Sequence, residues 1–256
     1  MPTTPTQGLL YRPSLGLLWI KQGTGGTNGN YNLVNSSLTG AYTGSFDRSI
    51  VTAVGLQFAV RSTLLSSDAT IAWTLYEFTS GSGVRQYINE TSGGGGGNIY
   101  GPSSVGANIR AIVIEPAQNF FYATRQGTNE VVKIDRNGTL TGFASVTSPS
   151  GIAIDTTGNV YVGANGSNVV KITPGAVVTN YSSGTFTAPT ALAYDDTRNM
   201  VVVGDSSSGT VYGITQSGGT VTLGTGAGTI GGIVTANGTI YIYDSGGSLK
   251  SVSLSY

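Results

Sequence analysis

The chain has 256 residues, 40 of them glycine, and only 9% are charged, with 12 basic residues balancing 12 acidic ones. Because the net charge is zero and no run of like charges occurs, the composition argues against nucleic-acid binding. The sequence contains neither Cys nor His, which excludes disulfides, thiolate metal sites and catalysis by a Ser–His–Asp or Cys–His arrangement.

The N-terminal region carries no recognisable export signal. Residues 1–8 lack Lys and Arg, and the apolar stretch of residues 9–20 is interrupted by Arg12 and Pro13. This stretch is too short and too interrupted for a signal peptide or a membrane helix, so we expect no membrane insertion. A surface so poor in charge is typical of extracellular and virus-particle proteins. We therefore expect the chain on a virion or another extracellular surface, made without a recognisable signal peptide.

A similar unit recurs along the chain, about every 40 residues in its clearest copies. It starts at Gly8 (GLLYRPSLGLLWIKQ) and returns at Ala111 (AIVIEPAQNFFYATR), Gly151 (GIAIDTTGNVYVGAN), Ala191 (ALAYDDTRNMVVVGD) and Gly231 (GGIVTANGTIYIYD). Each unit has an apolar strand, a polar turn, a second apolar strand, a Gly/Ser/Asn loop, a third strand and a weaker fourth strand. Four antiparallel strands in a unit of this length predict one blade of a propeller.

The units divide the chain into six blades, near residues 8–46, 50–104, 107–146, 149–186, 189–226 and 229–256. The second blade is irregular and has enlarged loops. The last blade ends after its third strand, so we predict that residues 2–7 supply its outer strand and close the ring, the alternative being a three-stranded final blade. The sequence thus predicts one domain over residues 1–256, an all-β, six-bladed β-propeller of four-stranded antiparallel blades.

The fourth unit carries the clearest family signature, SPSGIAID (residues 148–155) followed by GNVYVGANGSNVVKIT (residues 158–173). This segment resembles an NHL repeat, in which a Pro-Gly-initiated strand precedes Gly-Asn-apolar-Tyr-Val, a Gly/Asn loop and an Arg-bearing third strand. The third and fifth units resemble it less closely, and Val170 and Lys171 stand near the place of the third-strand Arg. The resemblance implies a propeller and no particular activity, because propellers host many functions.

One polar residue per blade is predicted just beyond the end of the second strand. Alignment of the units gives Gln22, Glu77, Arg125, Asn165, Asp205 and Asp244. They would lie on the face of the second-to-third-strand loops as a polar ring that binds a small ligand or a cation. The alternative is that Asn165, Asp205 and Asp244 cap their own turns through side-chain-to-backbone hydrogen bonds. The charge varies from blade to blade, which argues against a symmetric ion site, and we predict no metal and no cofactor.

Acidic residues also occur in the first-to-second-strand turns, on the opposite face, at Asp155, Asp195 and Asp196. Calcium needs several convergent oxygen ligands, whereas these residues come from separate blades. Asp-x-x-Gly-Asn is ordinary turn chemistry, so we interpret all three as structural.

The aromatic residues form two groups. Matching second-strand positions predict packing between blades for Trp19, Trp73, Tyr122, Tyr161 and Tyr241. The candidates for exposed platforms form no recurrent motif; they are Tyr31, Tyr42, Tyr87, Tyr100 and Tyr181.

The sequence predicts a protein that is not an enzyme, because no catalytic motif surrounds its scattered carboxylates. The first hypothesis is a non-catalytic structural or adhesive component of a virus particle, such as a bacteriophage tail, collar or capsid surface. Its partners would be other virion proteins or a host-surface glycan or protein, and it would be free to form oligomers. The alternative is a free ligand-binding propeller, either lectin-like toward glycans or NHL-type toward proteins.

Overall fold

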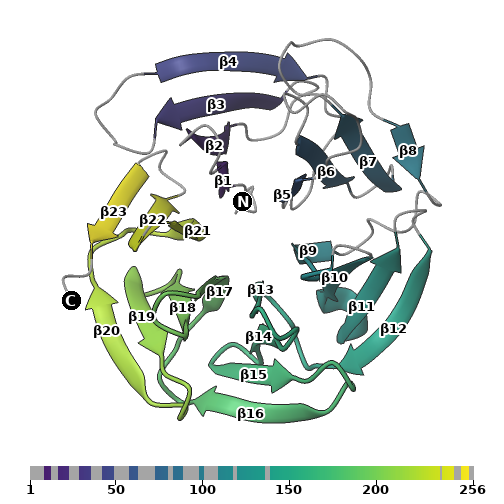
Figure 1. Ribbon diagram of the computed structural model, residues 1–256. Coiled ribbons are helices and arrows are strands. Elements are labelled where there is room, and N and C mark those ends of the chain that lie inside the picture. Colours follow the sequence, from purple (N-terminus) through teal and green to yellow (C-terminus); the bar gives the residue numbers. More distant parts are fainter. Residues whose placement is uncertain are drawn as a thin grey trace.

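The computed structural model describes residues 9–12, 17–22, 29–35, 42–48, 58–62, 73–79, 83–88, 98–100, 109–117, 120–135, 139–236, 238–244 and 249–253. Within these residues the strands form six separate antiparallel sheets. Figure 1 shows the sheets arranged in a ring, each with its first strand toward the centre and its last strand toward the rim. The protein is therefore an all-β, six-bladed β-propeller, as its sequence predicts.

Strands follow one another in space in the order in which they occur in the chain. The first blade contains β1 (Leu9–Arg12), β2 (Leu17–Gln22), β3 (Gly29–Asn35) and β4 (Tyr42–Arg48). The second contains β5 (Phe58–Ser62), β6 (Trp73–Thr79), β7 (Gly83–Ile88) and β8 (Asn98–Tyr100).

The next three blades are also four-stranded. The third contains β9 (Ile109–Ile114), β10 (Phe120–Arg125), β11 (Glu130–Asp135) and β12 (Leu140–Ser145), with the short helix η2 (Gln126–Thr128) between β10 and β11. The fourth contains β13 (Ile152–Ile154), β14 (Val160–Ala164), β15 (Asn168–Ile172) and β16 (Val178–Ser183). The fifth contains β17 (Pro189–Asp195), β18 (Met200–Asp205), β19 (Thr210–Ile214) and β20 (Thr220–Gly224).

The sixth blade closes the ring. Its described strands are β21 (Ile230–Ala236), β22 (Thr239–Asp244) and β23 (Leu249–Ser253). Strand β21 contacts β17 of the fifth blade and β1 of the first blade, so the two ends of the repeat meet. The predicted outer strand at residues 2–7 falls outside the described residues.

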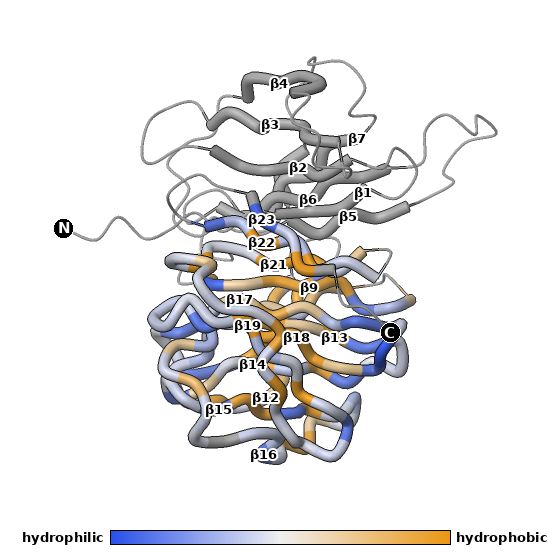
Figure 2. Tube along the Cα trace, turned by 90° about the vertical axis from the view of Figure 1, so that its left-hand side faces the viewer, coloured by the Kyte–Doolittle hydropathy of each residue, from blue (hydrophilic) through white to orange (hydrophobic). Residues whose placement is uncertain are grey.

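The hydrophobic core lies between adjacent blades. All five residues of β14 are buried, because the neighbouring blades cover both faces of the strand. Tyr122 and Tyr161 are each 3% exposed and lie in clusters that join neighbouring blades, which confirms their predicted packing between blades. Tyr241 is also buried, at 6% exposure. Figure 2 shows apolar residues running through the middle of the described blades, with polar residues toward the connections.

A β-bulge recurs where the third strand of a blade pairs with the fourth. The extra residue on the fourth strand is Phe143 in the third blade, Tyr181 in the fourth and Leu223 in the fifth. Each of these side chains packs against a core cluster. The bulge thus directs one side chain of an otherwise exposed strand inward.

Successive connections alternate between the two faces of the ring, because neighbouring strands are antiparallel. We call the face with the second-to-third-strand loops, such as 165–167 and 206–209, the loop face. The face with the first-to-second-strand turns, such as 155–159 and 195–199, is called the turn face. Among the described residues, no helix has the length and apolar character needed to span a membrane.

Candidate functional site

Three residues of the predicted polar ring occupy equivalent places on the loop face. Arg125, Asp205 and Asp244 each end the second strand of their blade. Each pairs with the first residue of the inner strand, and these partners are Ile109, Pro189 and Ile230. The structure therefore places these three residues at one level of the propeller, as the alignment of the sequence repeats predicts.

Asp205 connects its own loop to the preceding blade. It is 1% exposed, and Oδ1 accepts hydrogen bonds from the backbone N–H groups of Ser207 and Ser208 at 3.1 and 3.2 Å. The N–H groups of Thr187 and Ala188 donate to Oδ2 and Oδ1 at 2.6 and 3.2 Å. The carboxylate thus caps its own turn and also fixes the connection between the fourth and fifth blades.

The other two equivalent residues form ion pairs within their own blades. Arg125 Nη1 lies 2.8 Å from Glu130 Oε1. Lys250 Nζ lies 3.4 Å from Asp244 Oδ2 and donates to the carbonyl of Gly226 at 3.0 Å. Each charge is therefore partly satisfied by its neighbours, and a ligand bound to this ring stays a prediction.

The remaining three ring residues agree with their predicted placement to different degrees. Asn165 lies inside the loop with a φ of 50°, and strand pairing places Ala164 at the end of β14 instead. The reason is that the turn before β14 is one residue shorter than the turn before β18, since residues 155–159 separate Ile154 from Val160 whereas residues 195–200 separate Tyr194 from Val201. Glu77 lies within β6, opposite Phe58, rather than beyond the strand end. Gln22 is the last residue of β2.

On the turn face, Asp155 organises the turn between β13 and β14. Its Oδ1 accepts hydrogen bonds from the N–H and hydroxyl of Thr157 and from the N–H of Asn159. Its Oδ2 accepts from Asn159 Nδ2 at 2.8 Å and from the Tyr161 hydroxyl at 3.1 Å. Burial raises the pKa of Asp155, but these hydrogen bonds together outweigh burial and hold it below its usual value.

The equivalent turn of the fifth blade uses Asp195 in the same way. Asp195 accepts hydrogen bonds from the N–H groups of Thr197 and Arg198 and forms an ion pair with the Arg198 guanidinium. Burial, and then the charges of Asp195 and Asp155, raise the pKa of the adjacent Asp196. The structural interpretation of these acidic turns agrees with the bonds of Asp155 and Asp195.

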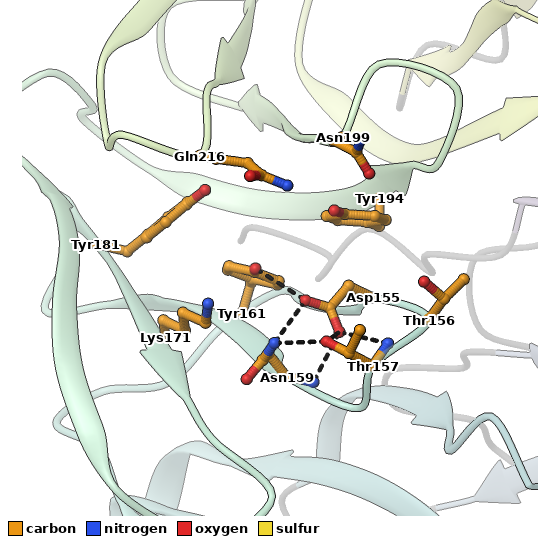
Figure 3. Close-up of a pocket in the computed structure, with 10 residues that line it drawn as sticks. All are labelled: Asp155, Thr156, Thr157, Asn159, Tyr161, Lys171, Tyr181, Tyr194, Asn199 and Gln216. Carbon is orange, nitrogen blue, oxygen red and sulfur yellow. Dashed lines mark hydrogen bonds between the residues drawn. The ribbon is translucent and has the colours of Figure 1, made fainter.

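Between these two turns lies a cavity of about 210 Å³, which we call the tyrosine pocket (Figure 3). It opens at the junction of the fourth and fifth blades. The residues that line it are Asp155, Thr156, Thr157, Asn159, Tyr161, Lys171, Tyr181, Tyr194, Asn199 and Gln216.

Three tyrosines give the pocket its character. The Tyr161 and Tyr194 rings lie nearly parallel, with centroids 5.8 Å apart and 14° between their planes, and the Tyr181 ring lies 4.9 Å from Tyr161. The Tyr181 hydroxyl donates to the carbonyl of Thr215 at 2.8 Å. Burial raises the pKa of all three phenols, most strongly for Tyr161, where the charge of Asp155 adds to the effect. They therefore stay neutral near pH 7 and act as hydrogen-bonding and stacking groups.

A lysine lies beside this aromatic cluster. Lys171 Nζ is 5.7 Å from the centroid of Tyr161, within the range of a cation–π contact. The third blade has a counterpart in Lys133, which lies 4.7 Å from the Phe143 centroid and 5.6 Å from that of Tyr122. The third and fourth blades thus share the pairing of a second-strand tyrosine with a third-strand lysine.

The described part of the chain contains no group of three or more acidic side chains placed to hold a metal ion. Asp155, the carboxylate that lines the pocket, has both oxygens engaged by its own turn and Tyr161. The arrangement is suited to stacking and hydrogen bonding with a small ligand.

Sequence reasoning missed the tyrosine pocket as a unit. The sequence suggests Tyr181 as an exposed platform and Tyr161 as a core residue, and no motif points to Tyr194. One difference between repeats indicates the pocket, because Tyr194 of the fifth blade stands where the fourth blade has Ile154. The pocket forms between blades, so no single repeat reveals it.

Comparison with known proteins supports the repeat architecture. A family model described as a β-propeller repeat, SBBP, matches residues 137–168, from the third blade into the fourth. A search of curated protein sequences gives no match.

Several solved structures share the fold. Virginiamycin B lyase from Staphylococcus aureus is 13% identical with a TM-score of 0.63, covering 100% of this chain and 86% of that one. The structure of a nidogen/laminin complex gives 14% identity and a TM-score of 0.69, covering 89% of this chain and 84% of that one. A gluconolactonase from Xanthomonas campestris is 12% identical with a TM-score of 0.63, and the match covers 98% of this chain and 87% of that one. At such identities the likeness shows the six-bladed propeller fold alone.

Proposed function

We propose that the chain is a non-catalytic β-propeller scaffold and serves as a structural or adhesive component of a virus particle, such as a bacteriophage tail, collar or capsid surface. Its partners would be other virion proteins or a host-surface glycan or protein. The observation that carries the non-catalytic part is the chemistry of the tyrosine pocket, where the carboxylate is saturated by hydrogen bonds and the phenols are neutral.

The absence of His supports the same conclusion. One of the solved neighbours is a virginiamycin B lyase in which a single histidine was replaced by alanine, and it is described as catalytically inactive. The present sequence has no His at any position. A lyase mechanism that depends on a histidine would have no counterpart here.

The virus-particle part rests on composition. With 9% charged residues, the surface relies on hydroxyl, amide and backbone groups for hydration. Such a surface carries little electrostatic repulsion between copies and is suited to incorporation in a larger assembly, either as an oligomer or beside other proteins.

A free ligand-binding propeller is the second candidate, and the tyrosine pocket favours it. Stacked phenol faces beside amide groups are suited to a small polar ligand. The NHL-like signature of residues 148–173 would instead favour a protein partner, and the nidogen propeller was solved together with laminin.

Mass spectrometry of purified virus particles tests the first candidate. Particles would be collected from cells that carry the gene, banded by density and digested. We expect peptides of this chain in the particle band at a constant ratio to the other particle proteins. Particles that lack these peptides, while the soluble fraction contains them, would exclude the virus-particle role and leave the free binding module.

A further inference from the structure

The tyrosine pocket departs from the repeat at two positions. The bulged residue of the fourth strand is Phe143 in the third blade and Leu223 in the fifth, but Tyr181 in the fourth. The penultimate residue of the inner strand in the fifth blade is Tyr194, whose counterpart in the fourth blade is Ile154. Two phenols therefore stand at the junction of the fourth and fifth blades where the preceding junction has Phe and Ile.

Packing between blades does not require these hydroxyls. At the junction of the third and fourth blades, Phe143 and Ile154 pack with Tyr122 in one hydrophobic cluster. A hydroxyl moved away from water costs free energy unless it gains a hydrogen-bonding partner. Tyr181 gains such a partner in the Thr215 carbonyl of the fifth blade. The two phenols make this junction more polar than the preceding one, and they border the pocket.

The size of the pocket limits what it can hold. Sites for drug-sized ligands have volumes of about 300 Å³ or more, whereas this pocket has about 210 Å³. A ligand with a single ring fits this volume. The partly buried rings of Tyr181 and Tyr194 border the pocket, and Figure 3 shows the Asn199 and Gln216 amides above them.

The charges of the lining favour a neutral ligand. Asp155 and Lys171 are its charged residues, one negative and one positive. The Asp155 carboxylate already accepts five hydrogen bonds. Lys171 already lies beside the Tyr161 ring, the position that a ligand cation would take. The two charges of the lining balance each other, so the pocket offers no net charge that would attract an anion or a cation.

We propose that the tyrosine pocket binds one neutral pyranose sugar residue. The apolar face of the sugar ring stacks on a partly buried tyrosine ring. Its hydroxyls donate to the Asn159 side-chain oxygen, since both amide N–H groups of Asn159 are engaged by Asp155 and Thr157, and they exchange hydrogen bonds with the Asn199 and Gln216 amides. This assignment rests on the binding role in the proposed function and is independent of membership in a virus particle.

Binding of the methyl glycosides of glucose, galactose, mannose and N-acetylglucosamine tests the proposal. Saturation-transfer NMR identifies a bound glycoside, and titration gives its Kd. The double variant Tyr181→Phe/Tyr194→Ile reproduces the residues of the preceding junction, so we expect it to fold. We expect the affinity for the bound glycoside to fall at least tenfold in this variant, about 1.4 kcal/mol.

Tyr212→Phe is the matched control, because Tyr212 packs against Phe186 and does not line the pocket. Its affinity should equal that of the wild type. Should the double variant fail to fold, Asn199→Gly replaces it, since the positive φ of Asn199 suits glycine and removal of the amide should still weaken binding.

The proposal is overturned if no glycoside binds, if the folded double variant binds like the wild type, or if phosphate or tetramethylammonium binds more tightly than every glycoside. Failure here leaves the particle analysis unaffected. Peptides of the chain in particles, without sugar binding, would leave the structural role standing and remove only the sugar site.

Discussion

Asp155 shows how one buried carboxylate shapes the site. It accepts hydrogen bonds from backbone, hydroxyl, amide and phenol donors, and it links the turn at residues 155–159 to the Tyr161 hydroxyl. The position of Tyr161, which forms the centre of the tyrosine cluster, therefore depends on Asp155. A side chain with only acceptors is required at this position, because all five hydrogen bonds of the carboxylate come from donors.

Replacement of Asp155 by Asn should lower the free energy of unfolding by about 1–3 kcal/mol at pH 7, because an amide N–H₂ would face existing donors. The folded-state pKa of Asp155 is lowered. Its contribution is therefore complete above the unfolded-state pKa of about 3.9 and is lost as the pH falls through the folded-state pKa. Urea unfolding from pH 7 down to pH 2 should show the difference between wild type and variant shrinking below about pH 4. A difference that grows in acid would contradict this assignment.

Asp205 has a comparable role on the loop face. Replacement by Ala would leave the N–H groups of residues 187, 188, 207 and 208 without their carboxylate acceptor. We expect a loss of roughly 2–3 kcal/mol in chemical unfolding. Asp196→Ala is the control, since Asp196 is exposed, and it should change stability by less than about 0.5 kcal/mol. Equal stability of the Asp205 variant and the wild type would show that these bonds do not fix the blade connection.

Alignment of the sequence repeats predicts the positions of some ring residues better than those of others. The levels of Asp205 and Asp244 follow from hydrophobic strands that precede them directly. The predicted position of Asn165 is one residue too far along the chain, because the turn between β13 and β14 is one residue shorter than the turn between β17 and β18. Single-residue register in such loops depends on backbone geometry, which composition does not encode.

At the scale of elements, close contact between the fourth and fifth blades leaves no room for a side chain at Gly163 in β14. A Cβ at this position would lie 2.1 Å from the Pro189 carbonyl oxygen and 2.5 Å from Ser150 Oγ. Ser150 donates to the Pro189 carbonyl at 2.7 Å and to that of Gly163 at 3.1 Å, so it fastens the fourth blade to the fifth. Strand β14 therefore packs backbone against backbone with the start of β17 at this point.

Gly163→Ala should therefore destabilise the protein by about 1–3 kcal/mol through overpacking. Gly142→Ala is the matched control in β12, because its Cβ would meet no atom within 4 Å. Alanine has the better intrinsic propensity in a strand, so the control should be neutral or up to about 1 kcal/mol more stable. The two variants would be compared by urea unfolding. Similar stabilities would argue against the tight contact between blades.

At the scale of the whole molecule, the propeller follows from periodic sequence. Second strands such as β14 and β18 are almost entirely apolar, and polar turns separate them from their neighbours at regular intervals. These patterns predict blades and the ring that they form. The tyrosine pocket could not be predicted in the same way, because Tyr161 and Tyr194 come from different repeats and meet only when blades pack.

The central claim, a propeller that binds a small sugar without chemical change, is tested most directly by one proton NMR experiment. The wild-type protein would be kept with the four methyl glycosides, with saturation transfer recorded at the start and the sugar spectrum recorded again after a day. We expect transfer to the ring protons of at least one glycoside and an unchanged sugar spectrum. Conversion of a glycoside to a new species, or no transfer to any of them, would contradict it.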